Sequence, residues 1–393
     1  MSGNARKFLP CLVIASSLLG CGSDDDSGGA AVSRDAVVKN YAANLYAGYA
    51  DSVTDETAFQ GDISAFLADP TEDTLATART SWLASRAHYM LTEGGRFYGG
   101  PIDGEIDGAP NYEALVNSWP LDEAFIDYTA ADDTAGIVNQ TDLLADITAQ
   151  GLDDLNATMG DKDISAGYHA VEFLLWGQAL EPVGPGERPA TDYATDGPRP
   201  NVDRRSQYLN VAVDGIIANL TAVRDAWKPA ATYRVSFEKN TDDSLTNMFT
   251  GLAKFSKGEL GSQRIGAAYM SKDRRDQHDC FSSETLVDYE RDARGIQAMY
   301  LGKYGDNDGP GLNDLVKAAD PALDADLQAK IQASIDAIVA IPKPFEDAIA
   351  GDDDSPGRKA IQKALDALNT QGDTFGLAAA ALGLTIIVDD PAE

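Results

Sequence analysis

The chain has 393 residues, of which 63 are acidic and 31 basic, so its formal net charge is −32. This excess argues against binding nucleic acid or an anionic lipid surface through a basic patch, and it concentrates cations, metal ions included, near the protein. A solubility or salt adaptation spread over the surface would produce the same acidity. Charge therefore excludes partners better than it names one.

The N-terminus predicts export and a lipid anchor. Two basic residues precede an apolar run too short for an ordinary membrane-spanning helix, which is typical of a secretory signal over residues 1–20. Small residues then lead to Cys21, as at sites where bacteria attach lipid; the alternative is a chance cysteine beside an ordinary cleavage site. Gly22 is not an inner-membrane retention aspartate, which favours the periplasmic face of the outer membrane. Residues 21–34 predict a disordered tether, and Cys280 is left without a disulfide partner.

Three helices are predicted in the first part of the chain. Apolar stripes at helical spacing begin at Val37 and at Phe59. The third helix is expected to open at Asp69 and Pro70, with Asp69 as the cap and Glu72 completing a capping box.

The middle of the chain contains the most apolar predicted helix. Residues 143–155 predict a helix with one buried face, whereas residues 164–176 are apolar nearly all round, as expected at the centre of a bundle. Gly177 closes that helix. Prolines and glycines then fill residues 181–204, where we place a crossover or domain boundary.

The second half repeats the helical pattern. Residues 384–388 are the exception and predict either a short strand or an apolar tail docked on the body. An all-α protein of two packed helical bundles, residues 35–180 and 205–393, is the simplest account. The stripes of the second half run through residues 208–223, 245–255, 286–300, 327–338 and 361–368.

His169 and Glu172 form the strongest local signal for chemistry. They are three residues apart on the most apolar helix, so their side chains are neighbours on one face. The pair can bind a divalent metal, or the carboxylate can orient the imidazole as a base. A buried hydrogen bond that merely satisfies two polar groups is the alternative. Because burying a carboxylate is costly without a compensating partner, the apolar setting favours a functional pair.

Two further stretches carry candidate ligand-binding residues. Arg79, Arg86 and Glu93 share a stripe of the third helix, which is either a binding face or a solvated face with arginine stems lying on Trp82. His88 is interpreted as structural.

In the second half, Glu259 falls on the apolar face of its helix, so it should point inward or toward the other bundle. If it is buried there, it needs Arg264 or a metal as partner. His278 lies in a charged segment, residues 272–279, whose composition predicts exposure. It is either a ligand or a surface histidine.

The segment Gly167-x-His169-x-x-Glu172 matches the motif of the imelysin family, and other segments resemble its iron-regulated branch. The resemblance implies an all-helical fold of two bundle-like halves with the site between them, export to the envelope, a role in iron uptake beside other envelope proteins, and a metal near His169 and Glu172. The matching segments, in family order, are Trp119-Pro120-Leu121-Asp122-Glu123, Arg188-Pro189-x-x-Asp192-Tyr193, Gly258-Glu259-Leu260, His278-x-Cys280-Phe281-Ser282 and Gly295-Ile296-Gln297-x-x-Tyr300-Leu301-Gly302.

The resemblance also places Arg96, Trp119, Asp122 and Glu123 close to the site. From the residues alone, Trp119 before a proline fixes a turn, while Asp122 or Glu123 orients a ligand or caps a helix.

Family members are classed as metallopeptidases after the founding member, but the zincin motif His-Glu-x-x-His is absent here. With three histidines in the chain, coordination rich in oxygen is easier to build, and it suits iron or calcium at least as well as zinc. The expected function is an envelope-anchored protein that binds a divalent metal, iron first, in iron uptake or its regulation.

Two alternatives remain. One is a metallopeptidase with Glu172 or Glu259 as ligand or base. The other is a metal-free module in which Arg79, Arg86 and Arg96 receive an anionic ligand or peptide.

Overall fold

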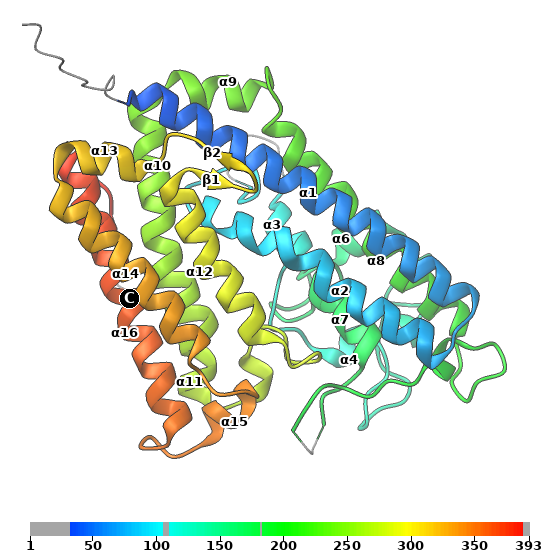
Figure 1. Cartoon of the computed structure of the whole chain (residues 1–393). Coiled ribbons are helices and arrows are strands. Elements are labelled where there is room, and N and C mark those ends of the chain that lie inside the picture. Colours follow the sequence, from blue (N-terminus) through cyan, green and yellow to red (C-terminus); the bar gives the residue numbers. More distant parts are fainter. Residues whose placement is uncertain (1–31, 105–109, 181–182, 388–393) are drawn as a thin grey trace, which may run out of the picture. The chain divides into compact units, whose positions relative to one another are not determined.

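The computed structural model describes residues 32–104, 110–180 and 183–387 and is almost entirely helical (Figure 1). The all-α prediction is confirmed: the strands within these ranges are β1 (Lys303–Tyr304) and β2 (Asn307–Asp308), paired antiparallel. The predicted signal, Cys21 and most of the predicted tether lie outside the described residues. In the described ranges, no helix combines the length and apolar composition needed to cross a membrane.

The first two helices pack against each other along their length. Helix α1 (Arg34–Ala68) is one helix of 35 residues, so the prediction of two helices here is wrong. Residues 50–58 contain neither proline nor glycine, and nothing interrupts the backbone hydrogen bonds between the two apolar stripes.

The predicted start of α2 (Glu72–Thr92) is also wrong. Thr71 caps it, and the side chain that returns the bond to the cap is Thr74 rather than Glu72.

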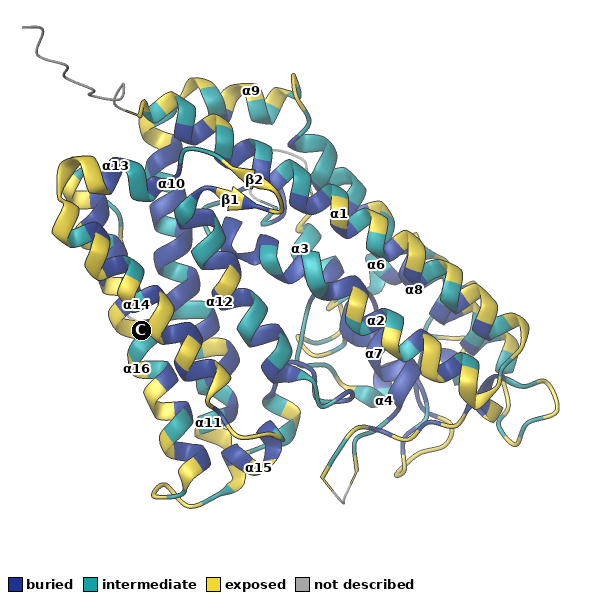
Figure 2. Ribbon diagram, in the orientation of Figure 1, coloured by how far each residue is buried: buried dark blue, intermediate teal, exposed yellow. Residues whose placement is uncertain are grey.

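The segment from residue 93 to residue 201 consists of short helices joined by loops. Helix α6 covers only the second part of the helix predicted over residues 143–155, whereas α7 is buried along its whole length, as predicted (Figure 2). The elements are η1 (Glu93–Gly95), α3 (Tyr112–Val116), α4 (Glu123–Ile126), α5 (Gly136–Asn139), α6 (Ala149–Leu155), α7 (Tyr168–Trp176) and η2 (Ala190–Tyr193).

Helix α8 (Val202–Ala226) follows the segment rich in proline and glycine and returns to the first helices. It packs against α1, α3, α6 and α7. Buried apolar side chains from both halves of the chain belong to one hydrophobic core. The division into two bundles at residues 181–204 stays a prediction.

In the second half of the chain, α16 packs against α14, η3 and α10, and α13 and α15 also contact it (Figure 1). Helix α12 packs against α14 on one side and against α2 and η1 on the other, so it joins the late helices to the early ones. Residues 384–387 form neither helix nor strand, and Leu384 packs into the core. Of the two predictions for this segment, the apolar tail docked on the body fits the structure. The elements are α9 (Thr232–Lys239), α10 (Thr241–Lys254), η3 (Phe255–Gly266), α11 (Ala267–Ser271), η4 (Arg274–Asp276), α12 (Thr285–Leu301), α13 (Leu312–Ala319), α14 (Pro321–Val339), α15 (Phe345–Ala350) and α16 (Pro356–Ala381).

Element η3 continues α10 as a π-helix of twelve residues. In a π-helix the backbone bonds join residues five apart, so residues at that spacing lie on the same face. Arg264 donates from Nε to Glu259 Oε1, five residues earlier, at 3.1 Å. Arg264, one of the two partners considered for Glu259, is thus the one that it contacts, and the Glu259 side chain is partly exposed.

Candidate metal centre

His169 and Glu172 lie on helix α7, whose start is held in place by a close backbone contact at Gly167. It begins after Gly167, whose φ is +87°, and a Cβ at Gly167 would lie 2.4 Å from the Val116 carbonyl oxygen. Only glycine fits this approach. Inside the helix, His169 Nδ1 lies 3.1 Å from Glu172 Oε2, and both side chains are buried. The predicted pairing of these two residues on one face is therefore present.

Glu172 also ties α7 to the loop that carries His278. Its Oε1 accepts the backbone N–H of Phe281 at 3.1 Å and that of Ser282 at 2.7 Å. This anchoring brings His278 beside His169, with ring centroids 4.7 Å apart and planes at 71°. The predicted exposure of His278 is wrong: the residue is 2% exposed. The loop folds back onto α7 because a buried carboxylate needs N–H donors, which the charged composition of the loop does not reveal.

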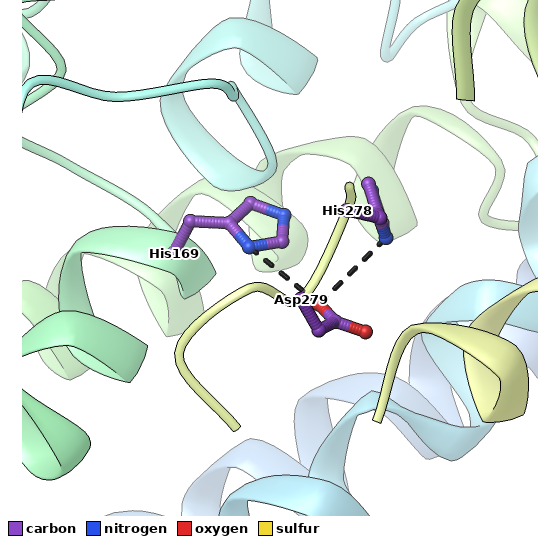
Figure 3. Close-up of side chains that lie close together, drawn as sticks. All are labelled: His169, His278 and Asp279. Carbon is purple, nitrogen blue, oxygen red and sulfur yellow. Dashed lines mark ion pairs between the residues drawn. The ribbon is translucent and has the colours of Figure 1, made fainter. Parts of the chain in front are cut away.

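Asp279 completes a cluster of metal-ligating atoms that the sequence did not predict. One ligand atom each from His169, His278 and Asp279 lies within 4.8 Å of the others, and all three residues are buried. Asp279 Oδ1 lies 3.6 Å from His169 Nδ1 and 3.7 Å from His278 Nδ1 (Figure 3). Neither oxygen of Asp279 has a hydrogen-bond partner among the described residues, nor do His169 Nε2 and both nitrogens of His278. The cluster is a buried set of unused donors and acceptors.

Arg86 borders the cluster and is fully buried, so it does not form the solvated face considered for its stripe. Its Nε donates to Asp288 Oδ2 at 2.9 Å, and one terminal nitrogen donates to Asn117 Oδ1 at 3.1 Å. The guanidinium carbon lies 4.7 Å from the Tyr168 ring centroid. Asp279 Oδ1 is 3.5 Å from the guanidinium. Asp288 is thus the main counterion of Arg86, and Asp279 remains available to another cation.

The electrostatics keep both imidazoles neutral near pH 7. Burial, followed by the proximity of the His278 ring and of the Arg86 guanidinium, lowers the pKa of His169 well below its ordinary value. Burial likewise lowers the pKa of His278 to about 3. Burial raises the pKa of Glu172 to about 8 and that of Asp279 well above its usual range. Burial alone would also raise the pKa of Asp288, but Arg86 overcomes this effect and holds that pKa well below normal. Neutral imidazoles are the form that binds metal.

A second buried network holds four of the predicted residues. Glu93 accepts from Arg96 at 2.9 Å and from Arg264, while Arg264 also donates to Asp292 at 2.9 Å. Burial alone would raise the pKa of Glu93, but the two arginines lower it to about 2. These residues join η1, η3 and α12. Together with the 3.1 Å bond from Arg264 to Glu259, these contacts engage both Arg96 and Arg264 with carboxylates.

Of the other predicted residues, Trp119 alone touches the cluster. Its ring stands edge-on to His278 at 5.2 Å between centroids. Asp122 caps α4 by accepting from Ala124 N, and Glu123 accepts from Gln178. Arg79 donates to the backbone carbonyls of Leu175 and Arg188, so it closes the end of α7.

An all-helical protein with a buried pair of imidazoles and a carboxylate is the class that fold and geometry define. The chain belongs to the imelysin family, because the family described as Imelysin matches residues 45–375. The fold is similar to the crystal structure of a candidate iron-regulated protein A precursor from Parabacteroides distasonis, with a TM-score of 0.69, 20% identity, and coverage of 90% of this chain and 97% of that chain. No curated protein matches the chain. The predicted family resemblance is confirmed.

Proposed function

We propose that this chain is an exported, lipid-anchored member of the imelysin family that binds a divalent metal ion, iron, in iron uptake or its regulation. The observation that carries the proposal is the set of ligand atoms of His169, His278 and Asp279, which lie within 4.8 Å of one another in a buried place. Their side chains have unused polar atoms, and burying such atoms without a partner costs free energy that a cation would offset. The residues therefore fit a metal ion.

The chemistry of the three donors favours iron with zinc as the competing ion. Two imidazoles with one carboxylate form the set that non-haem iron(II) sites use, and the same set also suits zinc. Calcium prefers oxygen ligands throughout, so the second imidazole makes it the least favoured of the three ions. Iron gains further support from the solved structure of similar fold, which is described as that of an iron-regulated protein.

Glu172 and Arg86 would position the ligands. Glu172 Oε2 lies 3.1 Å from His169 Nδ1, and a carboxyl group in contact with one nitrogen of a ligating histidine fixes the ring and its tautomer. The same Glu172 holds the loop of His278 and Asp279 through two backbone N–H groups. Arg86, held by Asp288, fixes the other side of Asp279. We therefore propose His169, His278 and Asp279 as ligands and Glu172 as the residue that positions two of them.

Export and lipid anchoring rest on the N-terminal sequence, with residues 1–20 as the signal and Cys21 as the lipidated residue. The description of the similar solved structure as a precursor supports export. Other envelope proteins of iron uptake are the proposed partners.

The geometry gives no specific support to the two alternatives. Peptide cleavage requires that a polypeptide reach the metal, yet His169 and His278 are 1% and 2% exposed. An anionic ligand on the stripe of Arg79, Arg86 and Arg96 would have to displace the carboxylates and backbone carbonyls that these arginines already bind. Metal binding in a buried centre is the function that the contacts support best.

Elemental analysis of the protein purified without an affinity tag tests this proposal. The expected result is close to one iron or zinc per chain, lost in His169→Ala and Glu172→Ala and kept in His88→Ala. His88 is the matched control because its half-exposed ring pairs with Asp55 at 2.5 Å, away from the cluster. A parent protein without metal after incubation with iron, zinc and calcium would contradict the proposal.

A further inference from the structure

A hollow in the surface lies at the opposite end of α7 from His169. Its volume is about 470 Å³, and residues around it include Tyr128, Gly177, Val183, Arg188 and Arg199. Gly177 follows the last residue of α7 and His169 is the second, so the two ends are roughly 12 Å apart along the helix. The volume falls in the range of roughly 300–1,000 Å³ typical of small-molecule sites. The hollow is therefore separate from the metal centre and large enough for a ligand.

Arg199 brings a positive charge to this hollow. Its guanidinium carbon lies 3.8 Å from the centroid of the Tyr128 ring, and among the described residues no carboxylate pairs with it. A guanidinium stacked on a ring keeps its N–H edge free for two parallel hydrogen bonds to a carboxylate or phosphate. In a protein of formal charge −32, this arginine offers an attractive place for an anion.

Arg188, which also lines the hollow, carries a second hydrogen-bond donor. Its side chain is 1% exposed and its terminal nitrogen donates to Asp127 Oδ2 at 2.7 Å. Its Nε–H, in contrast, has no hydrogen-bond partner in the described part of the chain. A Cβ built on Gly177 would lie only 3.5 Å from this Nε. Gly177 and Arg188 both line the hollow, so the absence of a side chain at position 177 leaves the space beside this buried donor unfilled.

The walls of the hollow select the kind of anion. Leu180 and Val183 are 55% and 38% exposed, and they would cover an apolar group. Glu187 also lines the hollow and is exposed, so its charge disfavours an anion that carries more than one negative charge. We propose that this hollow binds a small organic monocarboxylate with an apolar substituent, whose carboxylate accepts from Arg199 and from Nε of Arg188.

Isothermal titration calorimetry with benzoate tests the proposal, with benzyl alcohol and inorganic phosphate as comparison ligands. Benzoate should bind saturably to the parent protein, more tightly than phosphate, and benzyl alcohol should not bind. Arg199→Gln should weaken benzoate binding by at least about tenfold, because it removes a hydrogen-bonded charge. Val183→Asp should weaken it as well, because it places a second negative charge on the apolar wall.

Arg294→Gln is the matched control, since Arg294 is half-exposed, pairs with Glu290 and does not line the hollow. Metal content should be unchanged in Arg199→Gln, which separates this site from the metal centre. Absence of benzoate binding by the parent protein would overturn the proposal. So would equal affinity in Arg199→Gln, or phosphate binding at least as tight as benzoate.

Discussion

Replacing Glu56 with glutamine should stabilise the protein at alkaline pH and leave it nearly unchanged at acidic pH. Glu56 lies on α1 with no exposed surface, and neither carboxyl oxygen has a hydrogen-bond partner among the described residues. Burial raises the pKa of Glu56 to about 7, although Arg86 acts in the opposite direction. The folded protein therefore holds a proton on Glu56 that the unfolded chain releases near pH 4.5.

The size of the effect follows from this difference in pKa. A folded-state pKa above the unfolded one means that the stability is fully present below about pH 4.5 and falls as pH rises toward 7. A shift from 4.5 to about 7 corresponds to about 3 kcal/mol once Glu56 is ionised in both states. Glutamine resembles the protonated acid and does not titrate. Between pH 5 and pH 8 the variant should therefore gain about 2 kcal/mol relative to the parent.

Urea unfolding of the parent and of Glu56→Gln at pH 5 and pH 8 measures this gain directly. Comparing the two proteins at each pH cancels the titration of groups distant from Glu56. Asp354→Asn is the control, because Asp354 is 99% exposed and its carboxylate is solvated in both states. A stability difference between parent and Glu56→Gln that is the same at both pH values would refute the reasoning.

Three further substitutions test the packing around the centre. Arg86→Ala leaves Asp288 buried without its counterion, so the free energy of unfolding in urea should fall by about 3–5 kcal/mol, and a loss below about 1 kcal/mol would contradict the role of the pair. Gly295→Ala places a Cβ 2.6 Å from the Leu91 carbonyl oxygen, where α12 meets α2, so the unfolding free energy should drop by about 1–3 kcal/mol. In Gly258→Ala the added Cβ meets nothing within 4 Å, so the free energy of unfolding in urea should not fall; an equal drop in both glycine variants would count against the close approach.

The sequence predicted the helical class and the pairing of His169 with Glu172, because both depend on local spacing. It missed Asp279 and Asp288, which reach the centre through tertiary contacts. Asp288 and Asp292 lie one turn apart on the buried face of α12, beside Tyr289 and Ile296. Because these two aspartates interrupt an apolar stripe, the sequence does indicate that buried cationic partners exist. Spacing alone does not say which arginine pairs with which aspartate.

The loop of His278 and the π-helix η3 show what local patterns cannot supply. His278 is buried because Glu172, more than a hundred residues earlier, binds the loop through two N–H groups. In an α-helix, residues five apart point in different directions, so the contact of Glu259 with Arg264 depends on the π-helical backbone. Neither the long-range anchor nor the change of helix type has a signature in the residue pattern.

The central claim is that His169, His278 and Asp279 hold a divalent metal ion. An anaerobic titration of the metal-free protein with iron(II), followed by calorimetry, tests it most directly, with His278→Ala and His88→Ala measured beside the parent. We predict one binding event per chain in the parent and in His88→Ala, and its loss in His278→Ala. Equal binding by all three proteins, or no binding by the parent, would contradict the assignment of the centre.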